Sequence, residues 1–258
     1  MLTGRGSGRV AAAERRGWRL TADDCGRAVL FAHLVLSPLL FSIDTNDAVE
    51  LPKAALLTLA ALILAALGLS SWLRSGGGLR IGERLATLPG PRTDPLGWGM
   101  VLFVVSAAVS TLGSIHPALS FRGAPQSQAG LLTIVSYLAL FFATRQLCPT
   151  IADGRRLLTA AIVGSAVASA YAAVQVAQLD PVPWFETATL ENFYVRPFGT
   201  LGHPNFLAGY LVMALPLLGY FAAQAWVERR RSSCGALTLM SALGVIIVFA
   251  TCSRGGWV

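Results

Sequence analysis

The chain has few charged residues. Asp, Glu, Lys and Arg together make up 13% of its 258 residues, about half the share of roughly 25% found in soluble globular domains. Hydrophobic residues account for 54%, and the mean hydropathy is +0.61. This composition excludes an ordinary soluble domain and directs attention to membrane proteins.

Cysteine and histidine are also scarce. The chain has four cysteines, Cys25, Cys148, Cys234 and Cys252, whose spacing fits neither a metal site nor a redox pair. Its three histidines are scattered, and no carboxylate stands beside any of them in the sequence. We therefore expect structural cysteines, no metal ion and no cofactor.

Long apolar runs are what the chain has instead. A helix that crosses the hydrocarbon core needs roughly 20 mostly apolar residues, and seven runs approach or reach that length. They cover residues 28–43, 54–72, 96–112, 131–144, 157–176, 206–226 and 236–252. The runs are continuously apolar and lack the alternation of a membrane β-barrel. They predict an all-α polytopic membrane protein with about seven transmembrane helices.

The basic residues predict how the chain is oriented. Sixteen of the 20 Lys and Arg residues fall in the N-terminal tail and in alternate loops, which the positive-inside rule places in the cytoplasm. The topology is then N-in and C-out. Four basic residues remain on the outer side: Lys53, Arg122, Arg196 and Arg254. Because this pattern accounts for the net charge of +7, we expect no nucleic acid as a partner.

This topology divides the chain into two segments. Residues 1–27 are expected to form a disordered, basic cytoplasmic tail, and residues 28–258 form the transmembrane helical domain. Within that domain, small residues dominate 159–173, and such a surface lets helices approach closely in lipid. We therefore expect this span to lie inside the bundle.

The segment 196–205 is a compact polar cluster at a predicted membrane boundary. Arg196 offers paired donors to phosphate oxygens, and His203 can act as an acid or a base near neutral pH. A simpler interpretation also fits. Arg196 would then anchor to lipid phosphate, and His203, Pro204 and Asn205 would start the next helix, with Asn205 as its N-cap.

Two further arginines share the predicted outer side. Arg254 directly follows the last apolar run, where its charge needs water, lipid phosphate or a bound anion. Gly255 and Gly256 beside it leave backbone donors open to a ligand. Arg122 lies in another outer loop. We predict that Arg196, Arg254 and Arg122 converge on one pyrophosphate; the alternative is that each is an interfacial anchor.

These segments resemble the O-antigen ligase and polymerase superfamily. Residues 196–210 match its pattern R-x-F-G-T-x-x-x-x-N-x-x-A-x-Y, and residues 251–257 match T-x-S-R-G-x-W. The E-L-P-K loop at 50–53 and the S-x-x-G…G-L segment at 120–130 are weaker matches. The resemblance extends over nearly all of the chain beyond the tail, roughly residues 31–258.

The resemblance implies a metal-independent glycosyltransferase of the bacterial inner membrane. Such proteins take a glycan from an undecaprenyl-pyrophosphate carrier at the periplasmic face. They transfer it to lipid A core, to a growing glycan or to a protein. Matched by motif, Arg196 and Arg254 hold the pyrophosphate, and Arg122 is a further candidate. His203 and Asn205 are candidate ligand contacts. Membrane lipid is the remaining expected partner.

The chain departs from the family at its end. Family members have further spans and a large periplasmic loop with the catalytic histidine, and this sequence stops before that loop, at Val258. We therefore expect an N-terminal fragment whose catalytic residue is unknown and which can lack activity by itself. Two alternatives stay open: an anion (bicarbonate-like) transporter and a non-catalytic membrane scaffold. The apolar runs hold almost no ionisable residues apart from His33, which disfavours coupled transport.

Overall fold

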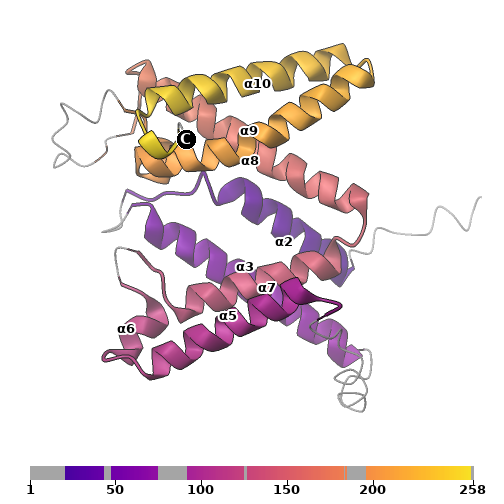
Figure 1. The fold of residues 1–258 in the computed structure, drawn as a ribbon, viewed down its shortest axis with the longest axis vertical. Helices are drawn as coiled ribbons and strands as arrows, with labels where there is room; N and C mark the ends of the chain where they lie inside the picture. The colour runs from indigo at the N-terminus through magenta and orange to yellow at the C-terminus, as the bar shows by residue number, and fades with distance from the viewer. Residues whose placement is uncertain are drawn as a thin grey trace, which may run out of the picture.

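The computed structural model describes residues 21–43, 48–74, 92–124, 127–182, 184 and 196–256. Within these residues all regular structure is helical (Figure 1). The elements in chain order are α2 (Ala22–Leu36), α3 (Glu50–Arg74), α5 (Pro95–Leu112), α6 (Pro117–Arg122), α7 (Leu131–Leu147), α8 (Ile151–Val176), the 3-10 turn η2 (Gly199–Leu201), α9 (Pro204–Val227), α10 (Arg231–Ala250) and the 3-10 turn η3 (Arg254–Gly256).

Among the described residues, five helices, α3, α5, α8, α9 and α10, are long and apolar enough to cross a membrane. They have 18 to 26 residues, which corresponds to about 27–39 Å at a rise of about 1.5 Å per residue, against a hydrocarbon core of about 30 Å. The apolar helices α2 and α7 are shorter, with 15 and 17 residues. The prediction of a helical chain with several membrane-length helices is confirmed. That all seven cross the membrane stays a prediction.

Many outward-facing side chains of these helices are large and apolar. Leu62 on α3, Leu102 on α5 and Phe249 on α10 are each exposed over more than 60% of their surface. Exposed apolar surface of this extent would be unfavourable in water, but it matches the hydrocarbon around a membrane helix. The apolar surface of these helices and their length therefore both fit helices that cross a membrane.

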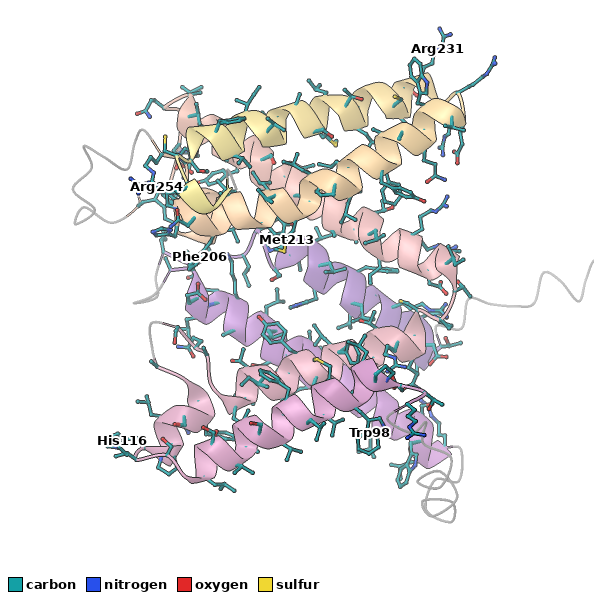
Figure 2. All side chains as sticks on the ribbon, in the orientation of Figure 1. Trp98, His116, Phe206, Met213, Arg231 and Arg254 are labelled. Carbon is teal, nitrogen blue, oxygen red and sulfur yellow. The ribbon has the colours of Figure 1, made fainter. Side chains whose placement is uncertain are left out.

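Successive apolar helices run in alternating directions, so their connections gather at two ends of the bundle (Figure 1). Arg254 and His116 lie at one end, and Arg231 and Trp98 lie at the other (Figure 2). We call these the Arg254 end and the Arg231 end. Of the 13 basic residues that the structure describes, nine lie at the Arg231 end. The four at the Arg254 end are Lys53, Arg122, Arg196 and Arg254. Which end faces the outside of a cell stays a prediction.

The first apolar helix begins and ends earlier than the sequence indicated. α2 starts at Ala22, where Thr21 and Asp24 form a capping box. The Asp24 N–H donates to the Thr21 hydroxyl over 3.1 Å, and the Thr21 N–H donates to the Asp24 carboxylate over 3.2 Å. The helix ends at Leu36, before Pro38, which has no N–H for a helical hydrogen bond.

These ends correct two predictions. An apolar helix over 28–43 is wrong, because the proline stops the helix well before residue 43. The boundary of the tail at residue 27 is also wrong, because the capping box starts the helix at Ala22. The rest of the predicted tail, residues 1–20, lies outside the described residues.

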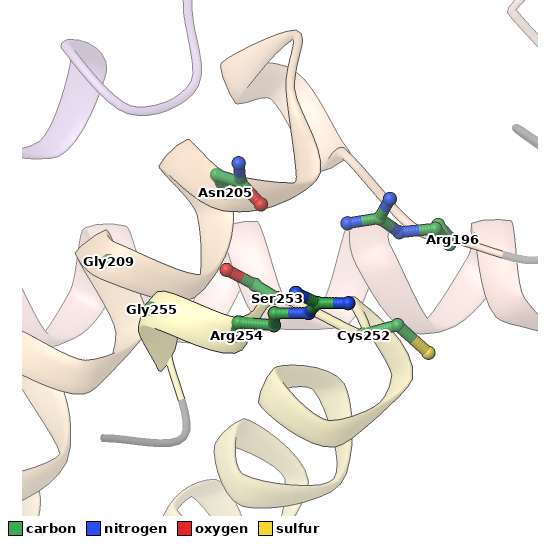
Figure 3. A pocket seen from close by; sticks show the side chains of 7 residues that line it. All are labelled: Arg196, Asn205, Gly209, Cys252, Ser253, Arg254 and Gly255. Carbon is green, nitrogen blue, oxygen red and sulfur yellow. The ribbon is translucent and has the colours of Figure 1, made fainter.

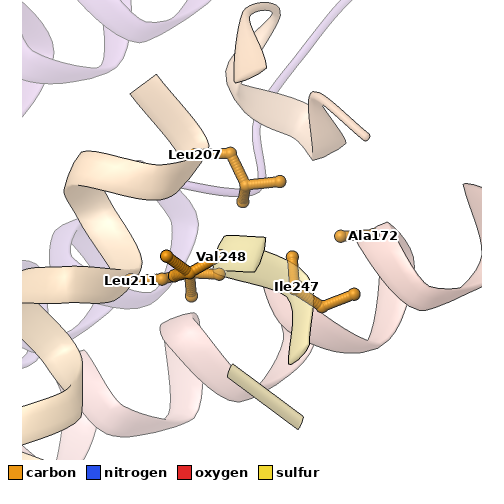
Figure 4. Packing of buried hydrophobic residues seen from close by; sticks show 5 residues of the cluster. All are labelled: Ala172, Leu207, Leu211, Ile247 and Val248. Carbon is orange, nitrogen blue, oxygen red and sulfur yellow. The ribbon is translucent and has the colours of Figure 1, made fainter. Parts of the chain in front are cut away.

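A buried apolar cluster joins α8, α9 and α10 near the Arg254 end (Figure 4). It consists of Ala172 from α8, Leu207 and Leu211 from α9, and Ile247 and Val248 from α10. Each of these side chains is at most 5% exposed. The cluster fixes the start of α9 against the end of α10, which are the two chain segments that carry the polar motifs.

Small side chains make α8 the central helix of this group. Its buried residues include Gly164, Ser165, Ala168, Ser169 and Ala172, and α2, α9 and α10 all pack against it. Small residues allow this because they let three backbones approach one helix closely. The small residues form the buried face of α8, whereas Val163 and Val167 on its other face are each 46% exposed. The prediction that this span lies inside the bundle is therefore confirmed for one face only.

Candidate anion-binding site

The segment 196–205 turns sharply before it enters α9. Gly199 and Gly202 have φ angles of 60° and 75°, which side chains other than glycine rarely adopt. A Cβ atom on Gly202 would also lie 2.7 Å from Cγ2 of Val49. The two glycines of the polar motif therefore allow a tight turn that packs directly against the residue preceding α3.

Three separate elements hold this turn in place. The side-chain oxygen of Gln175, at the end of α8, accepts hydrogen bonds from the N–H groups of Phe198 (3.2 Å) and Gly199 (2.7 Å). The Thr200 hydroxyl donates to the carbonyl of Pro38, just after α2. The Lys53 ammonium, on the first turn of α3, donates to the Thr200 carbonyl over 2.8 Å. The position of the turn is thus set by α2, α3 and α8 together.

Arg196 is attached to the end of α10. Its Nε atom donates to the carbonyl of Thr251 over 2.7 Å, and Thr251 is fully buried. This bond fixes the plane of the guanidinium group and leaves its two terminal nitrogens directed away from the carbonyl. A guanidinium held in this way can present a pair of parallel donors.

Arg196 and Arg254 line one hollow at the Arg254 end (Figure 3). The hollow has a volume of about 430 Å³, and Asn205, Gly209 and Ser253 contribute to its wall. The two guanidinium groups extend toward each other across it (Figure 3). A Cβ atom on Gly209 would meet no atom of the described residues within 4 Å, so these residues leave the wall on the α9 side open. The polar residues of two distant motifs therefore meet in one space.

The electrostatics of this hollow favour an anion. Within the described part of the chain, neither Arg196 nor Arg254 forms an ion pair with a carboxylate. The first turn of α9, which contributes Asn205, adds the positive end of a helix dipole. Two converging guanidinium groups repel each other unless a negative group lies between them. A phosphate or pyrophosphate fits both the charge and the paired donors.

The start of α9 corrects one assignment. The N-cap is His203, not Asn205: its Nδ1 atom accepts a hydrogen bond of 3.1 Å from the Asn205 N–H. Pro204 occupies the first helical position, where its missing N–H is not needed. Asn205 is the second helical residue, so its side chain is available to the hollow, which it lines. His203 is not among the residues that line the hollow.

Arg122 lies elsewhere at the same end of the bundle. It is the last residue of α6, is exposed, and does not line the hollow. Figure 1 shows α6 beside α5, with α2 and α3 between it and the α8–α10 group. The structure therefore brings together two of the three predicted arginines, Arg196 and Arg254, and keeps Arg122 apart from them.

A network around Asp180 supports the turn from the other side. Its carboxylate accepts hydrogen bonds from the Tyr171 hydroxyl (2.7 Å), the Gln175 side-chain amide (2.8 Å), the Val182 N–H (3.0 Å) and the Trp184 indole N–H (2.8 Å). Burial raises the pKa of Asp180, but these four donors outweigh burial and hold the pKa below its ordinary value. The ionised carboxylate thereby orients Gln175, whose oxygen holds the turn.

The sequence did not reveal Gln175, Asp180 or the partner carbonyl of Thr251 as parts of the site. One sequence feature could have pointed to Gln175, which is a polar residue near the end of a span rich in small apolar residues. Thr251 could have been found because it begins the second motif. Hydrogen bonds between residues far apart in the chain leave no such pattern, so their partners came only from the structure.

Among the described residues, no three His, Cys, Asp or Glu side chains form a group that could hold a metal ion. Comparisons of the chain with models of protein families, with curated proteins and with solved structures gave no match. The function must therefore be argued from the geometry of the hollow.

Proposed function

We propose that this protein binds the pyrophosphate of a lipid-linked glycan and takes part in transferring that glycan to an acceptor. One observation carries the proposal: Arg196 and Arg254, from separate motifs, extend toward each other in one hollow. Basic residues are scarce at this end of the bundle, so two in one space are best explained by an anionic ligand.

The chemistry of transfer suits two positioned guanidinium groups. An acceptor hydroxyl attacks the anomeric carbon, the bond from that carbon to the pyrophosphate oxygen breaks, and the hydroxyl proton passes to a base. Negative charge then grows on the departing pyrophosphate. Donors that are already in place stabilise this charge more in the transition state than in the ground state. Arg196 and Arg254 have this role in the proposal.

The proposed setting is the periplasmic face of a bacterial inner membrane. The donor is an undecaprenyl-pyrophosphate-linked glycan, and the acceptor is lipid A core, a glycan or a protein. This setting is supported by the resemblance of the two arginine motifs to the O-antigen ligase and polymerase superfamily. It is also supported by the split of basic residues between the two ends of the bundle, through the positive-inside rule.

Binding of undecaprenyl pyrophosphate to the full chain in nanodiscs tests the proposal. We expect Arg196→Ala and Arg254→Ala each to raise Kd by about 10- to 100-fold, because each removes charged hydrogen bonds. Arg196→Lys should lose most of this affinity as well, since an ammonium cannot keep the bond to the Thr251 carbonyl and still offer paired donors.

The matched control is Arg231→Ala, at the opposite end of α10 (Figure 2). It changes the net charge by the same amount and should leave Kd unchanged. Equal affinities for the wild type, Arg196→Ala and Arg254→Ala would sink the proposal. Transfer is measured in parallel as release of undecaprenyl pyrophosphate from a lipid-linked oligosaccharide. If Arg196→Ala and Arg254→Ala lose binding but retain transfer, the hollow takes no part in the transfer reaction.

A further inference from the structure

A second cavity lies between α2, α3 and α7. It has a volume of about 290 Å³, at the lower end of the range for small-molecule sites. Eight of its 11 lining residues carry polar or charged side chains. Such a lining is unusual among membrane-length helices and is not explained by the hollow around Arg196.

The cavity collects the two segments whose sequence motifs the hollow does not use. Glu50 and Lys53 come from the E-L-P-K segment at the start of α3. Ser127 and Gln128 come from the loop that ends the segment 120–130. His33 from α2 completes the wall. Residues from three distant parts of the chain thus meet around one space.

Two glycines, Gly123 and Gly130, constrain the described residues of the loop that borders this cavity. Gly123 has a φ of 93°, and a Cβ atom there would lie 2.6 Å from the backbone nitrogen of Ala129. A Cβ atom on Gly130 would in turn meet the backbone of Gly123. The two ends of the loop therefore touch, and the contact sets the position of Ser127 and Ala129, which are exposed at the Arg254 end.

The charges around this cavity differ from those around the hollow. Glu50 and Lys53 are three residues apart on α3 and share one face of the helix, so one negative and one positive side chain line the same wall. Among the described residues that line the hollow, two side chains are positive and none is negative. A lining without net charge favours a neutral polar ligand, because the attraction of an ion to one of the two groups is offset by its repulsion from the other.

The polar groups of the wall suit a ligand with several hydroxyls. Ser37, Ser127 and Tyr137 each offer a hydroxyl that can donate or accept. The ring of Tyr137, 56% exposed, adds an apolar face for the C–H side of a sugar ring. His33 contributes a buried Nδ1 atom that has no hydrogen-bond partner among the described residues. A wall that mixes donors, acceptors and one aromatic face is the chemistry that recognises a pyranose.

We propose that this cavity is a binding site for one neutral sugar residue. We assign this sugar to the acceptor of the transfer reaction. That assignment rests on the proposed function, whereas sugar binding itself does not. The Lys53 ammonium lines the cavity and also donates to the Thr200 carbonyl in the turn after Arg196. One residue therefore belongs to both the sugar site and the support of the arginine hollow.

Saturation-transfer NMR on the full chain in nanodiscs tests the sugar site, with the methyl glycosides of glucose, galactose and N-acetylglucosamine as probes. At least one should receive magnetisation from the wild type. Ala129→Leu places a larger side chain in the mouth of the cavity and should abolish the signal. Ala118→Leu changes another exposed alanine, on α6, which does not line the cavity, and should retain the signal.

Tyr137→Phe removes only a hydroxyl and provides a second, milder variant, for which we expect a weaker signal. The proposal is overturned if no probe gives a signal, if the signal survives Ala129→Leu, or if inorganic pyrophosphate displaces the sugar.

The sugar site and the transfer function can fail separately. If the arginine variants leave undecaprenyl pyrophosphate binding unchanged but the sugar still binds, the sugar site is upheld and the transfer function is rejected. A dodecyl glycoside in the disc bilayer then shows the source of the sugar. If it competes more strongly than the methyl glycoside, the natural ligand is a lipid-linked sugar; if it does not, the natural ligand is a soluble glycan.

Discussion

Single residues in the turn before α9 have roles that depend on the backbone as much as on side-chain chemistry. Gly202 combines a positive φ with contact to Val49, so glycine meets two requirements at one position. Arg196 acts through geometry as well as charge, because the bond from its Nε to Thr251 leaves its terminal nitrogens for a ligand. The motif residues therefore include both groups that line the hollow and groups that allow the chain to turn.

Gly202→Ala tests the backbone role. A left-handed conformation costs an alanine about 1–2 kcal/mol, and the new Cβ atom collides with Val49. We expect a lower midpoint of thermal unfolding in nanodiscs and weaker binding of undecaprenyl pyrophosphate. Gly219→Ala, in α9, is the matched control, since a Cβ atom there meets no atom within 4 Å. A variant at Gly202 as stable as this control would contradict the role assigned to the turn.

At the scale of elements, the end of α8 and the turn before α9 are joined by a chain of hydrogen bonds. Asp180 accepts from the Gln175 amide, and the Gln175 oxygen accepts from Phe198 and Gly199. The pKa of Asp180 is lowered in the folded chain because four donors outweigh its burial. The folded state thus holds the ionised form, while the unfolded state takes up a proton more readily as the pH falls.

We therefore expect Asp180 to stabilise the fold above its ordinary pKa of about 4 and to lose this contribution as the pH falls through its lower folded pKa. Asp180→Asn should lower the unfolding midpoint at pH 7, because its amide group brings a donor where acceptors are needed. It should also reduce the further loss between pH 6 and pH 3. Asp23→Asn, at the other end of the bundle, should retain the full acid loss. Parallel curves for the wild type and Asp180→Asn would exclude this account.

At the scale of the whole molecule, the alternating helices place native cysteines at both ends. Cys25, Cys148 and Cys234 lie next to helix termini at the Arg231 end, whereas Cys252 is exposed and lines the arginine hollow. A membrane-impermeant thiol reagent can therefore report orientation without engineered sites.

In intact bacterial spheroplasts, we expect a membrane-impermeant maleimide to modify Cys252 and to reach the other three cysteines only after permeabilisation. Undecaprenyl pyrophosphate should slow the modification of Cys252, because both occupy the hollow. Mass spectrometry of tryptic peptides assigns each site, and Cys252→Ser is the control. Modification of Cys148 or Cys234 before Cys252 in intact spheroplasts would reverse the predicted topology.

The sequence was sufficient for the parts of the fold that depend on local pattern. Continuous apolar runs predicted the helices, and small residues predicted the central place of α8. Both ends of α2 and the N-cap of α9 were missed, because a capping box, a proline and a histidine cap set these positions and the apolar pattern does not register them. The charge rule placed Arg196, Arg254 and Arg122 at one end of the bundle, but it gives no position across that end. Only the structure shows that Arg196 and Arg254 line one hollow and that Arg122 does not.

The bond between Lys53 and the Thr200 carbonyl also has a mechanical meaning. It joins α3 to the turn that α8 and α10 hold from the other side through Gln175 and Thr251. A motion that separates α3 from α8–α10 must break this bond or drag the turn, and with it Arg196. We therefore expect the spacing between the two groups of helices and the position of Arg196 to change together, so that a change in local bilayer thickness or lateral pressure alters the binding of the proposed pyrophosphate.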